Sequence, residues 1–179
     1  WCMGAGQELT LWCDLVMASE NAVFGLTGAR LGTLPTLGAT QYLPRLIGER
    51  LAREMMFLAR RFHAQEAVDI GLINRCVPQR DLHAETAKWC RTLKGHSPLA
   101  LRLIKRSLNF ESDQLYASWQ HGMEFLSHAR GAEESVEGLN AFIEDRKPDF
   151  QSFRVRNKRE LDDYLKGVTS GRQRRSPRT

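Results

Sequence analysis

Two glycine-rich segments at the start of the chain place the strongest constraint on its fold. Gly4-Ala5-Gly6 stands directly before a run that is typical of a helix, Gln7 to Trp12, and a second segment extends from Gly25 to Gly38. Small residues let backbone N–H groups approach a ligand closely, and a helix that begins there directs free N–H groups at negative charge. Glu8 adds one carboxylate in the first turn. This combination suits the stabilisation of an oxyanion or enolate better than metal or phosphate chemistry.

The rest of the sequence alternates short strands with helices and then continues as helices alone. Turn residues and β-branched runs predict strands over residues 15–18, 22–25 and 72–77. Ser97-Pro98 is a typical helix start, because Ser caps the free N–H groups and Pro fits the first position. The sequence predicts helices over residues 37–47, 50–60, 64–70, 81–93, 98–109, 113–129 and 133–144. The pattern therefore indicates an α/β protein with a helix-rich second part.

Composition limits the class of protein. The chain has 179 residues, of which 42% are hydrophobic, enough for one domain with a core. No apolar run approaches the roughly 18 residues of a membrane span, so we expect no membrane partner. Cys2, Cys13, Cys76 and Cys90 lack metal-ligand spacing, and three of them stand in apolar surroundings. This favours reduced, buried thiols over disulfides and predicts a cytoplasmic protein with no metal site. Because the chain begins at Trp1, inside a motif, we expect a fragment of a longer protein.

The net charge of +5 is distributed unevenly. Residues 146–179 hold 11 Lys or Arg and 4 Asp or Glu, a net of +7, which leaves −2 for residues 1–145. Few large apolar residues follow Val155, so this basic segment is predicted to be a disordered, solvated tail. Attraction to acidic phosphates or nucleic acid is the alternative. No nucleic-acid motif supports it, and we expect no nucleic-acid partner.

The order of these motifs resembles the crotonase (enoyl-CoA hydratase/isomerase) family. The likeness extends over roughly residues 1–153 in unbroken order and is specific for the family. It is much less specific for the reaction. The matching motifs are Gly4 to Glu8, Cys13-Asp14-Leu15, Phe24-Gly25, Gly32 to Pro35, Gly38-Ala39-Thr40, Ala64 to Ala67, Gly71 to Asn74, Ser97-Pro98, Lys105 and Asn140-Ala141-Phe142.

The resemblance implies a fold and a division of the chain. Residues 1–96 would be the C-terminal part of a crotonase core, an α/β spiral of ββα units. Residues 97–153 would be a helical region that covers CoA and forms a homotrimer or a dimer of trimers. Residues 154–179 would be the basic, disordered tail.

The family pattern also implies the catalytic groups. The N–H of Ala5, flanked by Gly4 and Gly6, would donate to the thioester oxygen, and the second donor would come from an earlier loop absent here. Glu8 matches the first of two catalytic glutamates of typical hydratases and would act as acid or base. Without the family, the small residues could be a tight helix entry, and Glu8 an ordinary first-turn acid.

Gly28 stands where those hydratases carry their second glutamate, so the two-carboxylate machinery for hydration is incomplete. In this respect the chain resembles the branch of 1,4-dihydroxy-2-naphthoyl-CoA synthases and ring-opening oxocyclohexanecarbonyl-CoA hydrolases, which also has a glycine at the position of the second acid. Thr33 replaces the active-site Ser of that branch. Other positions depart from the branch: Leu26, Pro35 and Arg130 stand where it has a Gln, an Asp and a Tyr.

Three further residues are predicted near the substrate. Arg30, in the second glycine loop, would line the site, or would be a solvated loop charge. Arg130 would reach an acyl or phosphate group, or would be an exposed cation at a helix end. Phe142 matches the family aromatic that packs near the CoA adenine, often in the neighbouring subunit. Leu26 and Pro35 complete the substrate-binding set with Gly4 and Gly6.

The resulting prediction is an acyl-CoA thioester enzyme that stabilises an enolate in an oxyanion hole. With Glu8 retained and the second acid lost, it favours a hydratase or lyase-type reaction on an unusual acyl-CoA. The alternatives are a naphthoyl-CoA-synthase-like cyclase, a ring-opening hydrolase, or a non-catalytic acyl-CoA-binding or assembly protein. No cofactor is expected beyond the CoA that arrives as part of the substrate.

Overall fold

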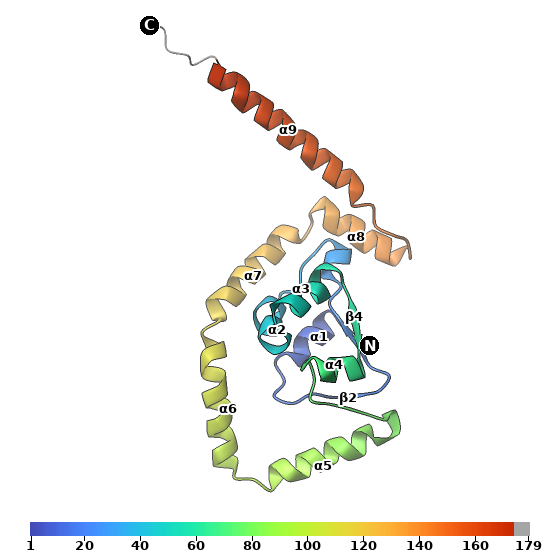
Figure 1. Ribbon diagram of the computed structural model, residues 1–179, viewed down its shortest axis with the longest axis vertical. Coiled ribbons are helices and arrows are strands. Elements are labelled where there is room, and N and C mark those ends of the chain that lie inside the picture. Colours follow the sequence, from blue (N-terminus) through green and yellow to red (C-terminus); the bar gives the residue numbers. More distant parts are fainter. Residues whose placement is uncertain (174–179) are drawn as a thin grey trace.

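The computed structural model describes residues 1–173, with the side chains described up to Tyr164 and at Lys166. A small α/β core is built from residues 1–77, and the helices that follow run around it as an arc (Figure 1). The last helix, α9 (Gln151–Gln173), extends away from the core (Figure 1).

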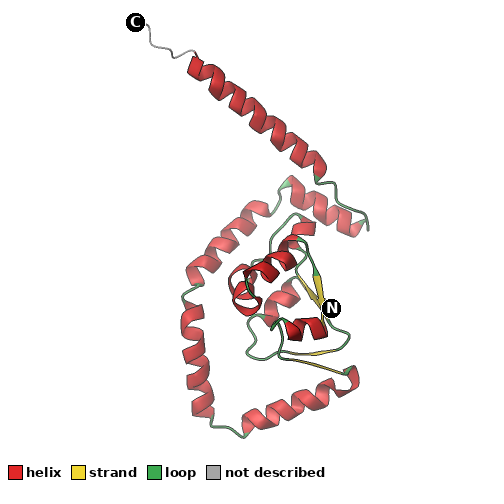
Figure 2. Ribbon diagram, viewed as in Figure 1, coloured by secondary structure: helices red, strands yellow, loops and turns green. Residues whose placement is uncertain are grey.

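Two small sheets organise the core (Figure 2). The first has the order β1 (Cys2–Met3), β3 (Val23–Gly25) and β4 (Arg61–His63), with β1 parallel and β4 antiparallel to the central β3. In the second, β2 (Met17–Ser19) pairs in parallel with β5 (Arg75–Val77). Parallel pairing requires crossover connections, and helices supply them here. β1 and β4, with two and three residues, were not expected from the sequence.

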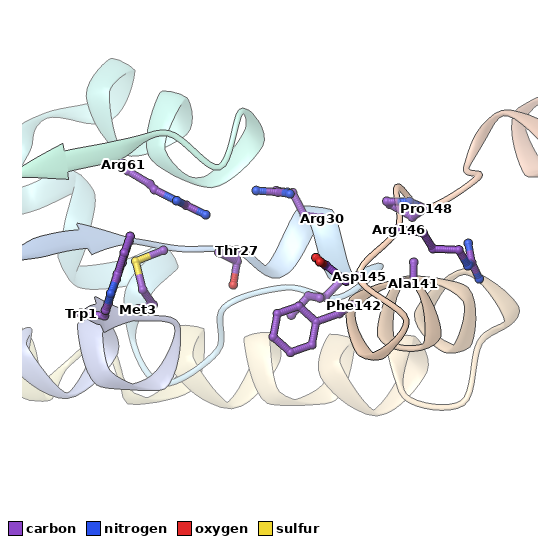
Figure 3. Close-up of a pocket in the computed structure, with 12 residues that line it drawn as sticks. Trp1, Met3, Thr27, Arg30, Arg61, Ala141, Phe142, Asp145, Arg146 and Pro148 are labelled. Atoms are coloured by element: carbon purple, nitrogen blue, oxygen red, sulfur yellow. The ribbon is translucent and has the colours of Figure 1, made fainter.

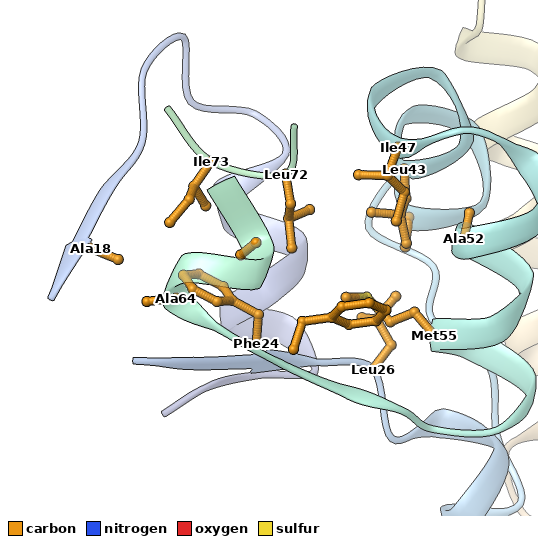
Figure 4. Packing of buried hydrophobic residues seen from close by; sticks show 13 residues of the cluster. Ala18, Phe24, Leu26, Leu43, Ile47, Ala52, Met55, Ala64, Leu72 and Ile73 are labelled. Atoms are coloured by element: carbon orange, nitrogen blue, oxygen red, sulfur yellow. The ribbon is translucent and has the colours of Figure 1, made fainter. Parts of the chain in front are cut away.

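Four helices enclose an apolar core beside these strands. They are α1 (Ala5–Thr10), α2 (Ala39–Ile47), α3 (Glu49–Phe57) and α4 (Ala64–Asp69). Phe24 of β3 and Phe62 of β4 pair in register and are almost fully buried, with Leu26 and Met55 close by (Figure 4). Burying side chains of this size supplies the main driving force for folding of the core.

The arc consists of α5 (Leu82–Lys94), α6 (Pro98–Asp113), α7 (Tyr116–Ala129) and α8 (Glu133–Ile143), and it follows the short helix η2 (Gln79–Asp81) (Figure 1). α5 and α6 have no buried residue. The Ser97 hydroxyl caps α6 as predicted, accepting from the N–H of Ala100 at 3.3 Å. α7 is attached to α2, because the Gln41 amide donates to the Ser118 carbonyl at 3.1 Å. Four apolar side chains of α6 remain exposed, namely Leu99, Leu103, Ile104 and Leu108.

α8 packs against the short helix η1 (Gly28–Leu31) through two glycines. A Cβ on Gly138 would lie 2.4 Å from the carbonyl carbon of Leu31, and one on Gly32 would lie 2.3 Å from the Glu134 oxygen. Neither distance is possible for real atoms, and both neighbours are backbone. Gly32 also has a φ of +64°, in the region that favours glycine. The two glycines therefore allow the backbones of α8 and the second glycine loop to touch.

The segment from residue 154 was expected to be disordered, and the structure corrects this as far as Gln173, where α9 ends. Low apolar content indicates that a segment lacks a core, but it does not exclude a helix. The Asp149 carboxylate accepts from the N–H groups of Gln151 and Ser152 at the start of α9. Arg156 pairs with Glu133 of α8 at 2.5 Å. The last part of the expected tail, residues 174–179, lies outside the described residues.

Two smaller expectations concern the thiols and the membrane. All four cysteines are free, but Cys13 and Cys90 are exposed, so the prediction of buried thiols is wrong for these two. Cys90 lies on α5, which buries none of its residues. Cys2 and Cys76 are half-buried. Among the described helices, none combines the length and the apolar composition needed to span a bilayer.

An ion pair at the end of α8 predicts a loss of stability in acid. Arg146 donates to the Glu137 carboxylate at 2.6 Å, and the N–H of Asp149 donates to it at 2.8 Å. These donors lower the pKa of Glu137 from 4.5 to about 2. A lowered carboxyl pKa stabilises the folded state above the unfolded pKa, and this stabilisation is lost as the pH falls toward 2. We therefore expect the melting temperature to fall over this range.

Thermal unfolding followed by circular dichroism at several acid pH values measures this effect. Glu137→Gln should flatten the acid slope, because the glutamine does not titrate. Glu49→Gln is the matched control, since Glu49 forms an exposed ion pair with Arg53 on α3 and should leave the slope unchanged. An acid slope that is the same in Glu137→Gln as in the unsubstituted protein would contradict the prediction.

Candidate active site

The first glycine segment forms the tight connection between β1 and α1. Gly4 has a φ of +55°, which favours glycine, and its N–H donates to the Gly25 carbonyl at 2.9 Å. Ala5 and Gly6 are exposed at the start of α1. The N–H of Ala5 has no acceptor among the described residues, and no side chain caps the helix. This N–H is therefore free to bind a ligand oxygen.

Glu8 lies one turn further along α1 and is only 5% exposed. Its Oε1 accepts from the N–H of Leu37 at 2.8 Å, which connects α1 to the second glycine loop. Burial raises the pKa of Glu8, while backbone hydrogen bonds from Leu37 and Thr36 oppose the rise. A carboxyl group with a raised pKa can exchange a proton closer to neutral pH than an exposed acid can.

The second glycine loop folds back over Gly28. The N–H of Thr33 donates to the Gly28 carbonyl at 3.0 Å, and a Cβ on Gly28 would lie 3.0 Å from the Thr33 oxygen. Thr33 and Pro35 are half-buried in this loop, which continues to the Leu37 N–H that holds Glu8. Ala5, Glu8, Gly28, Thr33 and Pro35 thus belong to two segments that the hydrogen bond between Leu37 and Glu8 connects.

Two other predicted residues, Arg30 and Phe142, line a separate pocket of about 440 Å³ (Figure 3). Arg30 comes from η1, and Phe142 comes from α8, so the glycine contact between these elements brings them together. Arg130 is exposed at the end of α7 and does not line this pocket.

Leu26 corrects the predicted substrate-binding set. Its side chain is 1% exposed and belongs to the hydrophobic core (Figure 4). Leu26 follows β3 directly, and its side chain lies in the same buried cluster as Phe24 and Met55. Leu26 is therefore a packing residue in this structure and not part of a ligand-binding surface.

Several residues near these sites were not identified from the sequence. Gln7 is fully buried, and its amide nitrogen and oxygen have no hydrogen-bond partner among the described residues. Leu37 contributes a backbone N–H, which leaves no signal in the side-chain pattern. Arg61 and Asp145 reach the pocket only because β4 and the end of α8 lie beside it. In the described part of the chain, no group of three or more His, Cys, Asp or Glu residues could hold a metal ion.

Comparison with known proteins identifies the same family that the sequence motifs resemble. Residues 1–154 match the family model described as enoyl-CoA hydratase/isomerase. An enoyl-CoA hydratase from Mycobacterium avium subsp. paratuberculosis K-10 is 31% identical, with a TM-score of 0.80 over 83% of this chain and 61% of its own. An enoyl-CoA hydratase/isomerase from Pseudoalteromonas atlantica T6c is 29% identical, with a TM-score of 0.76 over 83% and 60%.

A carnitinyl-CoA hydratase from Mycobacterium avium is 26% identical, with a TM-score of 0.80 over 84% of this chain and 59% of its own. The chain therefore spans about three-fifths of the length of these solved structures. Its core and arc of helices correspond to part of the crotonase-like α/β fold. With the family model matching nearly the whole described chain, this protein belongs to the enoyl-CoA hydratase/isomerase family.

Proposed function

We propose that this chain contributes one oxyanion donor and one catalytic carboxylate to an enzyme that acts on acyl-CoA thioesters. The donor is the N–H of Ala5, and the acid or base is Glu8. One observation carries the proposal: a buried carboxylate lies one turn of helix beyond an exposed N–H that has no acceptor in the described chain. Gly4 and Gly6 keep the approach to that N–H open, since a Cβ at either would meet nothing within 4 Å.

The chemistry follows from what a thioester requires. Removing a proton beside the thioester, or adding a nucleophile to the conjugated double bond, places negative charge on the thioester oxygen. A fixed N–H directed at that oxygen stabilises the charge without reorganisation of solvent. Glu8 would transfer the proton, and its hydrogen bond from Leu37 holds the carboxylate in one orientation. CoA enters as part of the substrate, and we propose no other cofactor.

The absence of a second catalytic acid limits the reactions that we propose for this chain. Gly28 provides no carboxylate, and the backbone of Thr33 and Leu34 lies against the position that a side chain would occupy. Two-carboxylate hydration is therefore not the reaction proposed. We propose instead a hydratase or lyase-type step on an unusual acyl-CoA, with Thr33 supplying a hydroxyl and Pro35 shaping the loop. The enoyl-CoA hydratase and the carnitinyl-CoA hydratase described above both carry the name hydratase, which supports this class of reaction.

Gly28 also favours a second candidate. The same glycine is expected in naphthoyl-CoA synthases and in ring-opening acyl-CoA hydrolases, which work without the second glutamate. A reaction that forms or breaks a carbon–carbon bond beside the thioester is therefore the alternative function. The burial of Glu8 is a reason to prefer either enzyme over a non-catalytic binding protein, since a buried carboxyl costs free energy to keep.

Thioester binding tests the proposal directly. Calorimetry of the full protein with a panel of saturated and unsaturated acyl-CoA thioesters, and with free CoA, should show tighter binding of a thioester than of CoA alone. Sedimentation of the same sample tests the proposed homotrimer or dimer of trimers. Failure to bind any thioester more tightly than CoA would overturn the proposed function.

A further inference from the structure

The pocket between the core and α8 has a wall of cations that the proposed chemistry does not use. It has a volume of about 440 Å³ and lies between β1, the loop after β3, the start of β4 and the end of α8 (Figure 3). Arg30 and Arg61 enter it from η1 and β4, while Met3, Ala141 and Phe142 give it apolar walls. A volume of this size is typical of small-molecule sites.

The two arginines face each other without an acid between them. Figure 3 shows Arg30 and Arg61 extending toward one another across the pocket. The Arg30 guanidinium has no hydrogen bond or ion pair with any described residue. The Arg61 guanidinium lies over the Trp1 ring, 5.3 Å from its centroid. Two guanidinium groups that face one another repel, and a bound anion between them would remove the repulsion. Planar guanidinium groups match a carboxylate with two parallel hydrogen bonds.

The remaining charges at the pocket leave this site positive. Arg146 also lines it, but this side chain is held by Glu137 and Glu144, each at 2.6 Å. Asp145 is the one acid among the described residues that line the pocket. In Figure 3 its carboxylate lies between Phe142 and the base of the Arg30 side chain. Two uncompensated cations therefore outnumber one acid.

The position of the pocket connects it with the substrate. Thr27 lines it and is followed directly by Gly28, where typical family members carry their second acid. The apolar walls fit a hydrocarbon segment, and the arginines fit an anion at its far end. We infer that this pocket selects acyl-CoA substrates whose acyl group ends in a carboxylate. This inference rests on the proposed function, because it assumes that the chain binds thioesters.

A matched pair of ligands tests the inference. Glutaryl-CoA and valeryl-CoA have acyl groups of five carbons and differ in a terminal carboxylate against a methyl group. We expect calorimetry at neutral pH to show glutaryl-CoA binding the full protein about ten times more tightly or better, as expected for a good charge-assisted contact. Arg30→Gln and Arg61→Gln should each remove most of this difference, so that each variant binds the two thioesters with similar affinity. Arg53→Gln, at an exposed ion pair on α3, is the control and should change neither affinity.

The outcomes separate this inference from the proposed function. Equal binding of the two thioesters by the unsubstituted protein overturns the inference and leaves the proposed function in place. A loss of valeryl-CoA and free CoA affinity in Arg30→Gln, equal to the loss for glutaryl-CoA, also overturns it. In that case the Arg30 guanidinium would bind the phosphates that all CoA compounds share. Failure to bind either thioester more tightly than free CoA removes the proposed function and this inference together.

Discussion

Glu8→Gln is expected to lower turnover of the full enzyme by about 100-fold to 10,000-fold, the usual contribution of a positioned acid or base. Glutamine has the shape of glutamate and keeps an oxygen that can accept from the Leu37 N–H, so the helix and loop should remain connected. The buried position also becomes neutral, which removes a desolvation cost and should not destabilise the fold. The loss should therefore appear in kcat and not in thioester affinity.

The pH dependence gives this prediction a second readout. Because burial raises the pKa of Glu8 above its usual 4.5, a reaction that needs the ionised carboxylate should slow as the pH falls through that raised value. This acid limb of the kcat profile should be absent from the residual activity of Glu8→Gln. Glu20→Gln, at an exposed turn, is the control and should leave kcat and its pH profile unchanged. Unchanged kcat in Glu8→Gln would show that this carboxylate is structural.

Several elements of the fold could be predicted from the sequence because they have strong local signals. The predicted helix over 98–109 begins where α6 does, since Ser97-Pro98 determines its start, and α4 ends next to the predicted stop at Gly71. β1 and β4 have no such signal. They are two and three residues long, and their pairing with β3 is decided by the tertiary structure.

Residue type and local order identify Ala5 and Glu8 as candidates, and their catalytic roles stay predictions. The sequence could not predict contacts between distant segments. Leu26 was assigned to the substrate because it stands where the resembled branch has a Gln, but its side chain is buried in the apolar core. Arg61 had no local signal at all, because its position across from Arg30 arises from the pairing of β4 with β3. Such contacts are determined by packing, which a single sequence pattern does not contain.

Gly138→Ala is expected to destabilise the protein, although glycine to alanine inside a helix normally stabilises. The normal gain is roughly 0.5–1 kcal/mol, because alanine loses less backbone freedom on folding. At Gly138 the new Cβ would lie 2.4 Å from the backbone of Leu31, so α8 must separate from η1. Overpacking of this kind costs typically about 1–3 kcal/mol. The packing cost exceeds the gain in propensity, and the net sign is destabilising.

Gly122 supplies the matched control, since it lies in the interior of α7 and is also buried. A Cβ there would meet the Gln41 amide at 3.7 Å, an ordinary contact, so Gly122→Ala should raise the free energy of unfolding by the usual increment. Denaturant unfolding of the two variants should therefore give changes of opposite sign. Stabilisation by Gly138→Ala would mean that α8 does not rest on η1.

Substitution of Gly32 tests whether Gly32 and Gly138 belong to the same interface between η1 and α8. Gly32→Ala should also destabilise, because its Cβ would lie 2.3 Å from the Glu134 oxygen and its φ is +64°. Once either substitution has separated α8 from η1, the second new Cβ no longer clashes as strongly with the opposite backbone. The double variant should therefore lose less unfolding free energy than the sum of the losses of the two single variants. Full additivity would contradict a shared interface. The same separation would move Phe142 away from Arg30, so both variants should also lose the expected preference for glutaryl-CoA.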